Sequence, residues 1–447
     1  MKETNTTLKR TLTLTPLVLF GLAYMTPMIV FGIYGMLAET TKGLVASAYS
    51  IALIAMLVTA SSYGHMVKAY PVSGSAYTYT RKSISSHLGF LVGWSVLLDY
   101  VFLPMVIWLI GSVYLAATFP GVPTWIWVIG FILVTTSINI IGIRVTAGVN
   151  FFMMLFQFLV ISLFIIFSII SLMRGEGMGT LFSAAPFFNG DVPFSLAFAG
   201  AAIACYSFLG FDAVSTLSEE TIEPEKTIPK AILLVALIGG AIFIVSSYFI
   251  YLIFPDYSQF VNTDSAGFEI AKFVGGNLFS ALFLAGIITA QFASGLSAQA
   301  SAARMLYAMG RDSVLPKRIF GFVHPRFQTP VLNLIVIGVI ALLALKMDMA
   351  TSTSFINFGA FVTFTFVNLS VIGHYYVKLR RRNGSGIFLY LLFPLLGACL
   401  DIWLLINLDV HALILGGSWV VLGVIYLLFL TNMFRKQPPE LVFEDAG

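Results

Sequence analysis

Twelve long apolar runs divide this chain of 447 residues and leave only short polar segments between them. A helix needs roughly 20 mostly apolar residues to cross a bilayer. The runs cover residues 15–38, 44–66, 86–118, 123–142, 147–173, 193–217, 229–254, 276–308, 330–347, 352–378, 387–407 and 411–434. Charged residues make up 10% of the chain, against roughly 25% in soluble domains. The pattern predicts an all-α integral membrane protein with 12 transmembrane helices, and it argues against a soluble enzyme, a nucleic-acid binder or a disordered scaffold.

The basic residues indicate how these spans are oriented. If the N-terminus lies in the cytoplasm and the spans alternate, 20 of the 24 Lys and Arg residues fall on the cytoplasmic side. This distribution follows the positive-inside rule. We therefore expect a multi-pass protein of the inner (cytoplasmic) cell membrane, with a cytoplasmic N-terminal tail of residues 1–14 and a cytoplasmic C-terminal tail of residues 435–447.

Two of the predicted spans contain features that interrupt helices. Pro27 lies in the middle of the first run, where it removes a backbone donor and frees carbonyl and amide groups near residues 23–30. The sixth run carries Gly210 beside an aromatic cluster and a carboxylate. Broken helices at matching positions of two halves indicate a transporter binding site. The alternative is a simple kink whose free groups are satisfied by neighbouring helices.

Three carboxylates lie at membrane depth, namely Asp99, Asp212 and Asp401. Ionisable residues inside a membrane are rare and mark substrate or proton sites. We interpret Asp99 in the third run and Asp212 in the sixth run as functional, because an aspartate that faces a cavity can bind a cationic substrate group or carry a coupling proton. Asp401 lies in the eleventh run, and we interpret it as a residue that fixes helix packing.

Small hydroxyl residues share one face of the eighth run, where Ser294, Ser297 and Ser301 follow a spacing of three and four. Their oxygens suit an alkali cation, although close helix packing explains small residues equally well. Cys205 and Cys399 lie in apolar runs and form no metal or redox motif. Since the sequence also lacks phosphate-binding and nucleophile motifs, we expect no cofactor, no metal site and no enzymatic activity.

Three motifs resemble those of the amino acid–polyamine–organocation family. They are Pro71-Val-Ser-Gly-Ser-Ala-Tyr77, then Gly210-Phe-Asp212 with Ser218-Glu-Glu-Thr221, and Arg304-Met-Leu-Tyr-Ala-Met-Gly-Arg311-Asp-Ser-Val-Leu-Pro316. Within the family, the stretches Gly21–Met28, Gly93–Tyr100 and Ile356–Ala360 are similar to those of the bacterial putrescine importers. The resemblance implies a LeuT-like five-plus-five inverted-repeat fold with discontinuous helices 1 and 6 and two additional helices. The repeats would be residues 15–173 and 193–378, followed by helices 11 and 12 in residues 387–434.

Together with the residue patterns, the resemblance implies a site between helices 1 and 6, with walls from helices 3, 8 and 10. The expected substrate-binding residues are Tyr24, Thr26, Pro27, Met28, Asp99, Trp108, Tyr206, Ser207, Phe208, Gly210, Asp212 and Asn357. The expected coupling-ion or proton residues are Asp99, Asp212, Gln157, Ser294 and Ser297, and the expected gate residues are Tyr206, Glu219 and Glu220.

Two positions depart from the pattern that the resemblance implies. Putrescine importers carry an acidic residue after the helix 1 break, where this chain has Gly32. Without that carboxylate, a monoamine or an amino acid is a candidate substrate beside a diamine. Proton-coupled members often carry a lysine in helix 5, where this chain has Gln157, a residue that cannot carry a proton.

The function that these observations favour is a secondary active importer of a small cationic amine or an amino acid. It would work by alternating access and be coupled to a H⁺ or Na⁺ gradient. The alternative is an ion-independent exchanger or uniporter of the same fold, and a channel or an intramembrane enzyme is more remote. We expect partners to be the small-molecule substrate, the coupling ion and lipid, with no nucleic acid, in a monomer or homodimer.

Overall fold

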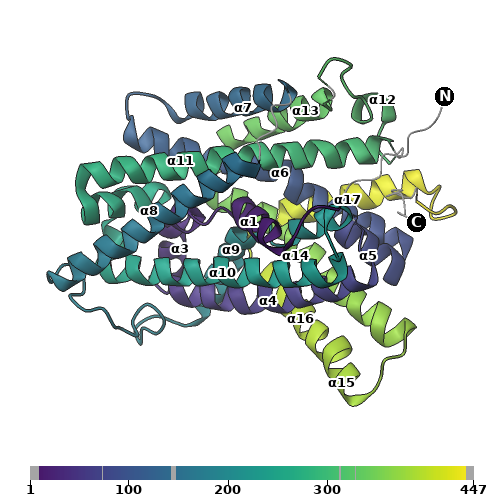
Figure 1. Cartoon of the computed structure of the whole chain (residues 1–447), viewed down its shortest axis with the longest axis horizontal. Coiled ribbons are helices and arrows are strands. Elements are labelled where there is room, and N and C mark those ends of the chain that lie inside the picture. Colours follow the sequence, from purple (N-terminus) through teal and green to yellow (C-terminus); the bar gives the residue numbers. More distant parts are fainter. Residues whose placement is uncertain (1–9, 73, 142–146, 312–313, 328, 439–447) are drawn as a thin grey trace.

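The computed structural model describes residues 10–72, 74–141, 147–311, 314–327 and 329–438. Within these ranges every regular element is a helix, and one isolated bridge joins Leu12 to Thr221. The long helices run side by side along the long axis of the molecule (Figure 1). Residues 1–9 and 439–447 of the expected tails, and Arg144, lie outside the described residues.

The first half of the chain contains five spans. Their elements are α1 (Leu14–Met25), α2 (Ile29–Gly32), α3 (Tyr34–Thr41), α4 (Val45–Ala69), α6 (Ser86–Thr118), α7 (Thr124–Ile141) and α8 (Ala147–Met173). The short helix α5 (Ser75–Ser83) lies between α4 and α6. Helix 1 is built from α1 to α3 and is therefore discontinuous, as the sequence predicts.

The second half begins with a second discontinuous span. Its elements are α9 (Ser195–Ala204), η1 (Cys205–Phe208), η2 (Asp212–Glu220), α10 (Pro224–Ile253), α11 (Ala266–Arg311), α13 (Val331–Ala341) with η5 (Leu342–Leu345), and α14 (Met349–Val371) with η6 (Ile372–Lys378). The connecting turns are η3 (Tyr257–Gln259), η4 (Thr263–Ser265) and α12 (Lys317–Phe320). The last two spans are α15 (Gly384–Ile387), η7 (Phe388–Leu392) and α16 (Phe393–Ile406), and then α17 (Val410–Leu430).

The described residues contain 11 helices that are long and apolar enough to cross a membrane, together with the shorter apolar segment Val331–Leu345. Each of the twelve predicted runs coincides with one of these segments. The eighth run is part of the longer α11, because α11 begins ten residues earlier and is kinked at Gly276, where φ is 65°. The prediction of an all-helical membrane fold is therefore confirmed.

Small residues allow the spans to pack closely, as is usual between membrane helices. Helix α4 packs along α10 and α6 packs along α11. Gly64 lies against Pro229, and a Cβ at Gly295 would come within 2.4 Å of Nε1 of Trp108. The opposite faces of the peripheral helices carry exposed apolar side chains, among them Leu133, Phe152 and Phe429. Such faces are suited to contact with lipid.

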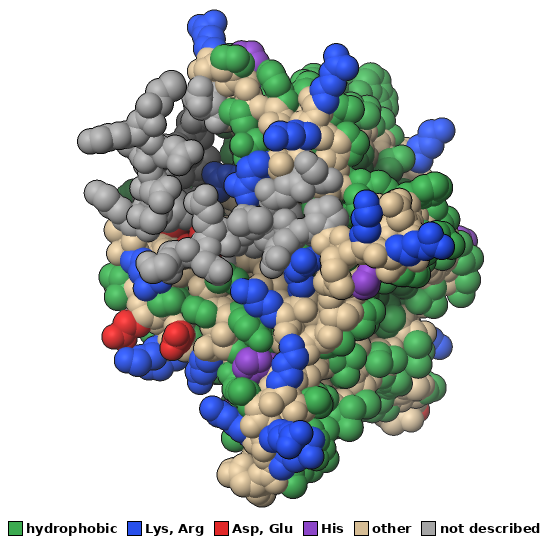
Figure 2. Space-filling view, turned by 90° about the vertical axis from the view of Figure 1, so that its right-hand side faces the viewer, with side chains coloured by type: hydrophobic (Ala, Val, Ile, Leu, Met, Phe, Trp, Pro, Cys, Tyr) green, Lys and Arg blue, Asp and Glu red, His purple; other side chains and the backbone are tan. Residues whose placement is uncertain are grey.

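Lys and Arg side chains gather at one end of the molecule, the end at which both termini are marked in Figure 1. Figure 2 shows this surface, which we call the basic end. The loops at the opposite end, which we call the far end, join α6 to α7, α8 to α9 and α10 to α11. The distribution of Lys and Arg in the sequence predicts that the basic end lies on one side of the membrane and the far end on the other.

Candidate functional site

The first break separates α1 from α2 at Thr26, whose φ of 56° lies in the left-handed region. The Thr26 hydroxyl donates to the carbonyls of Ala23 (3.3 Å) and Tyr24 (3.4 Å). Ser294 of α11 also donates its hydroxyl hydrogen to the Tyr24 carbonyl, at 3.3 Å. The predicted break is therefore confirmed, and several of its freed carbonyls have partners within the protein. Pro27 and Met28 lie in this break and are buried.

The second break follows η1, where Gly210 adopts φ of 111°, a conformation that favours glycine. Asn357 of α14 donates its side-chain amide to the carbonyls of Ala202 (2.8 Å) and Ile203 (3.3 Å). These carbonyls belong to the last turn of α9, just before η1, and the Ile203 carbonyl also accepts from the Cys205 amide. On the other side of the break, the Gly210 amide donates to Oδ1 of Asp212 at 3.4 Å.

The two breaks are in direct contact. A Cβ built on Gly210 would lie 2.3 Å from Cδ1 of Tyr24, so the tyrosine ring covers the glycine backbone. Tyr24 also lines the larger cavity described below, and so does Asp212, to which the Gly210 amide donates. The sequence predicts that the discontinuous helix 1 (α1 to α3) and the discontinuous helix 6 (α9, η1 and η2) lie side by side. The fold contains this contact.

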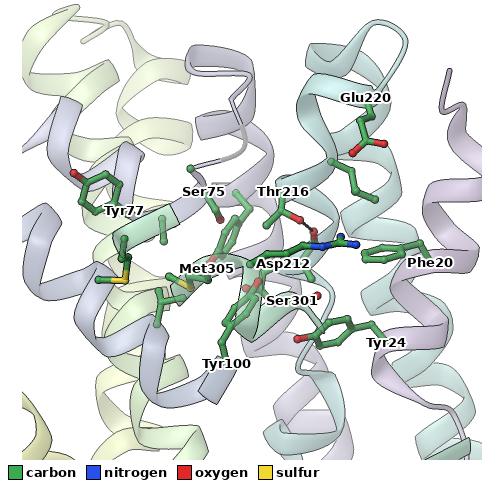
Figure 3. A pocket seen from close by; sticks show the side chains of 18 residues that line it. Phe20, Tyr24, Ser75, Tyr77, Tyr100, Asp212, Thr216, Glu220, Ser301 and Met305 are labelled. Atoms are coloured by element: carbon green, nitrogen blue, oxygen red, sulfur yellow. Dashed lines mark hydrogen bonds between the residues drawn. The ribbon is translucent and has the colours of Figure 1, made fainter. Parts of the chain in front are cut away.

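A cavity of about 300 Å³ extends from the breaks toward the basic end. Figure 3 shows Tyr24, Tyr100 and Asp212 close together at one end of it, while Glu220 lies toward the other. The walls come from α1, α4, α5, α6, η2 and α11, and they are mostly aromatic or apolar. Arg304, an exposed residue of α11, also lines the cavity. An apolar cavity with a few convergent polar groups is the usual form of a small-molecule site.

Two buried carboxylates give this region its charge. Asp212 lines the cavity, and Asp99 of α6 lies within electrostatic range of it. Both side chains are 8% exposed, and Oδ1 of Asp99 is buried without a hydrogen-bond partner. Among the described residues, no Lys, Arg or His forms an ion pair with either carboxylate. Because a lone buried charge is unfavourable, this arrangement favours a cationic ligand.

A second, much smaller cavity of about 20 Å³ lies beside the breaks. It is lined by Tyr24, Thr26, Tyr206, Ser294 and by Gln291 of α11. Gln291 is buried, and its Nε2 has no hydrogen-bond partner. The volume holds about one water molecule, so in this conformation the space admits no organic substrate. Sequence reasoning missed Gln291, because an isolated glutamine in an apolar run carries no pattern.

Several expected substrate residues line neither cavity in this conformation. Ser207 is hydrogen-bonded to the Tyr49 hydroxyl at 3.0 Å, and the Phe208 ring packs edge-on against Phe243. Trp108 is buried against Gly295, as described above. Asn357 holds the end of α9 and therefore positions the break.

The residues expected to bind a coupling ion or to form the gate lie in different surroundings. Ser297 is half-buried, and Gln157 is buried with its Nε2 4.0 Å from the sulfur of Met154. Glu219 and Glu220 end η2, and only Glu220 lines the larger cavity. Its backbone carbonyl accepts hydrogen bonds from the amides of residues 11 and 12, at 2.9 and 3.0 Å. Glu220 therefore lies at the end of the larger cavity that is away from the breaks, whereas Tyr206 lies beside them, and the gate role of these residues stays a prediction.

Asp401 belongs to a separate polar cluster away from both cavities. Its Oδ2 accepts hydrogen bonds from the Asn368 amide (2.8 Å) and the Thr59 hydroxyl (3.1 Å). These contacts join α4, α14 and α16 in the apolar interior. They support the interpretation of Asp401 as a packing residue.

Comparison with known proteins places these features in context. The family model described as amino acid permease matches residues 17–409. The chain is 44% identical over 441 residues to the low-affinity putrescine importer PlaP of Escherichia coli strain K12, covering 98% of this chain and 97% of that protein. It is 27% identical to the methylthioribose transporter of Bacillus subtilis, covering 94% of each. A solved sodium-coupled sialic acid symporter shares the fold, with a TM-score of 0.57 at 14% identity over 91% of this chain and 90% of that one.

Proposed function

This chain belongs to the amino acid permease family, and we propose that it imports a small diamine of the putrescine type by alternating access. Members of this family are transporters, so the protein is a membrane transporter and not an enzyme. The single observation that carries the proposed substrate is the presence of two buried carboxylates, Asp99 and Asp212, neither of which forms an ion pair with a Lys, Arg or His that the structure describes. A diamine supplies two ammonium groups to such a pair.

The aromatic side chains around the carboxylates also suit a cationic substrate. Tyr24, Tyr63 and Tyr100 line the larger cavity with Asp212. The faces of tyrosine rings attract ammonium groups, and their edges accept the methylene chain between two amino groups. The Asp99 and Asp212 carboxylates would hold the two ends, while Tyr206 would separate them from the far end.

Gly32 bears on the choice between a diamine and an amino acid. A Cβ at this position would lie 3.2 Å from Cγ2 of Ile110, so the backbone here is packed against α6. The resemblance implies a carboxylate at this point, where this chain has Gly32. A diamine would therefore rely on Asp99 and Asp212 alone. A cationic amino acid is the second candidate, because it needs a single carboxylate and a cradle of backbone amides for its own carboxylate.

We further propose that the basic end faces the cytoplasm and that the structure is open toward that side. The far end is closed: the Tyr114 hydroxyl donates to the Phe31 carbonyl at 2.5 Å. A Cβ at Gly35 would lie 2.0 Å from the Thr263 carbonyl oxygen, so α3 is pressed against η4. Since the larger cavity extends toward the basic end, it would release substrate into the cytoplasm. The pathway lies within one chain, which supports transport by the monomer.

A gradient of H⁺ or Na⁺ would drive the uptake. The Ser294 hydroxyl and the Tyr24 carbonyl would offer oxygen ligands to a sodium ion between α1 and α11, with Ser297 one turn away from Ser294. The ion-independent exchanger remains the second candidate mechanism, favoured by Gln157, which cannot carry a proton.

A thermal-shift screen of the purified protein tests the substrate class. A ligand at 100 times its Kd stabilises the folded state by about 2.7 kcal/mol. We expect putrescine and related diamines to raise the unfolding temperature, with monoamines and neutral amino acids having less effect. Stabilisation by amino acids alone would reject the diamine and favour the second candidate.

A further inference from the structure

The loop between η6 and α15 concentrates positive charge at one margin of the basic end. Its basic residues are Lys378, Arg380, Arg381 and Arg382, and all of these side chains are exposed. Lys82, at the end of α5, joins them, because its backbone carbonyl accepts a hydrogen bond from Nζ of Lys378. We call these five residues the basic loop cluster. Figure 1 shows that α15 projects from the molecule at the margin opposite α12.

Aromatic rings and a backbone carbonyl hold two of the guanidinium groups in place. Arg381 lies 5.4 Å from the centroid of the Tyr375 ring and 5.9 Å from that of Tyr390, and these two rings are stacked. Arg382 lies 5.0 Å from the centroid of the Tyr376 ring, and its Nε donates to the Tyr376 carbonyl at 3.3 Å. Because a guanidinium carries five N–H donors, each group keeps donors for a further partner.

Acidic side chains do not neutralise the cluster. Among the residues that the structure describes, none of the five members forms an ion pair with Asp or Glu. Glu225 of α10 interacts electrostatically with the neighbouring Tyr375, but it is not paired with Arg381. The positive-inside rule explains why basic residues lie on this side of the membrane. It does not require guanidinium groups to be fixed against tyrosine rings with donors to spare.

Exposed apolar side chains flank the cluster on both sides. Val377 of η6 precedes it, and Phe388 and Leu392 of η7 follow it. More than half of each of these residues is exposed. Fixed cations beside an apolar helix surface match the two parts of a membrane lipid, its charged headgroup and its acyl chains.

Phosphate is the anion that paired and stacked arginines recognise, and basic clusters directly next to membrane spans attract anionic lipids. We propose that the basic loop cluster binds the phosphate headgroup of an anionic phospholipid, whose acyl chains lie along η6 and η7. A free phosphate ion would leave Val377 and Phe388 without a partner, so the lipid is the favoured source of the phosphate. The site is separate from transport chemistry, since none of the five residues lines either cavity.

Native mass spectrometry of the full-length, delipidated protein in detergent tests the site. Cardiolipin, phosphatidylglycerol and phosphatidylethanolamine are added in turn, and the apparent Kd of each is measured. We expect cardiolipin, with two phosphates, to bind most tightly, and phosphatidylethanolamine, which has no net charge, to bind at least about tenfold more weakly. The triple variant Arg380→Gln, Arg381→Gln and Arg382→Gln should weaken cardiolipin binding by roughly 100-fold. Equal affinity for the three lipids would overturn the proposal.

The matched control removes the same charge at the opposite margin of the basic end. Lys317 and Arg318 of α12 and the nearby Arg326 are exposed, and their triple change to Gln gives the same net charge as the loop variant. Because salt screens charges that lie more than a Debye length away, the control should bind cardiolipin within about threefold of wild type. An equal loss in both triple variants would mean that cardiolipin responds to net charge alone, which rejects a site.

Thermal unfolding separates lipid binding from folding and from a free anion. Without lipid, the loop variant should unfold at the wild-type temperature, because the three altered side chains are exposed. Cardiolipin should stabilise the wild type and the control but not the loop variant. Excess inorganic phosphate should neither stabilise the wild type nor displace cardiolipin, and displacement would identify a free-anion site and contradict the lipid assignment. No readout uses the transported substrate, so failure here leaves the proposed function intact.

Discussion

The ring of Tyr24 lies directly against the backbone of Gly210, so that a Cβ on the glycine would come within 2.3 Å of the ring. Through this contact the break between α1 and α2 packs against the break between η1 and η2. Any movement of α1 that opens or closes the cavity must change the packing at Gly210. The contact therefore links substrate access to the conformation of the second break.

Gly210→Ala is expected to abolish most transport. The variant places a Cβ 2.3 Å from Cδ1 of Tyr24 and forces a non-glycine residue to φ of 111°, a strain of about 1–3 kcal/mol. The unfolding temperature should fall and the uptake of labelled substrate into proteoliposomes should drop. Gly130→Ala is the matched control, because nothing lies within 4 Å of its Cβ. Equal activity of the two variants would show that the contact is not required.

Asn357→Ala is expected to destabilise the end of α9. It leaves the carbonyls of Ala202 and Ile203 without their side-chain donor, at a cost of about 1–3 kcal/mol for buried groups. If Asn357 positions the break and does not contact substrate, the variant should lower stability and maximal uptake rate more than apparent affinity. A rise in KM with unchanged stability would instead indicate direct substrate contact.

Asp401→Asn and Asp401→Leu should behave differently. Asparagine keeps an oxygen that accepts from Thr59 and Asn368, whereas leucine removes the acceptor of the buried Thr59 hydroxyl and leaves the Asn368 amide only its bonds to Thr59 and Phe364. We therefore expect near-normal uptake and stability for the first variant and a clear loss of stability for the second. The comparison is made by thermal unfolding in detergent. Loss of uptake in a stable Asp401→Asn protein would give Asp401 a role in transport.

Gln291→Ala is expected to weaken substrate binding while leaving the protein folded. Its amide lines the small cavity between the two breaks and has no partner of its own, so it is free to bind a substrate group when that cavity expands. The change should appear as a raised KM for uptake. Ser280→Ala, at a buried position of the same helix outside both cavities, is the control. A KM equal to that of the control would remove Gln291 from the site.

The spans and both breaks could be predicted from the sequence, because they depend on local features. The apolar runs fix the helices, and Pro27 and Gly210 mark where the helical backbone ends. The positions of individual side chains depend on contacts between distant segments. Trp108 resembles a site aromatic in sequence, yet it packs on Gly295, which is far from it in the chain. For Gln291 the reverse is true: no pattern in the sequence marks it as a site residue, yet the fold places it in the lining of the small cavity together with Tyr206.

The most direct test of the account is the initial rate of labelled putrescine uptake into proteoliposomes under an inside-negative potential, measured for wild type, Asp99→Asn, Asp212→Asn and Asp401→Asn. Hydrogen bonds to charged groups contribute about 1.5–3 kcal/mol, so loss of either site carboxylate should lower kcat/KM by roughly 10- to 150-fold. Asp401→Asn should retain wild-type uptake. Wild-type kcat/KM in a folded Asp99→Asn and Asp212→Asn protein would contradict the account, because the substrate would then bind elsewhere.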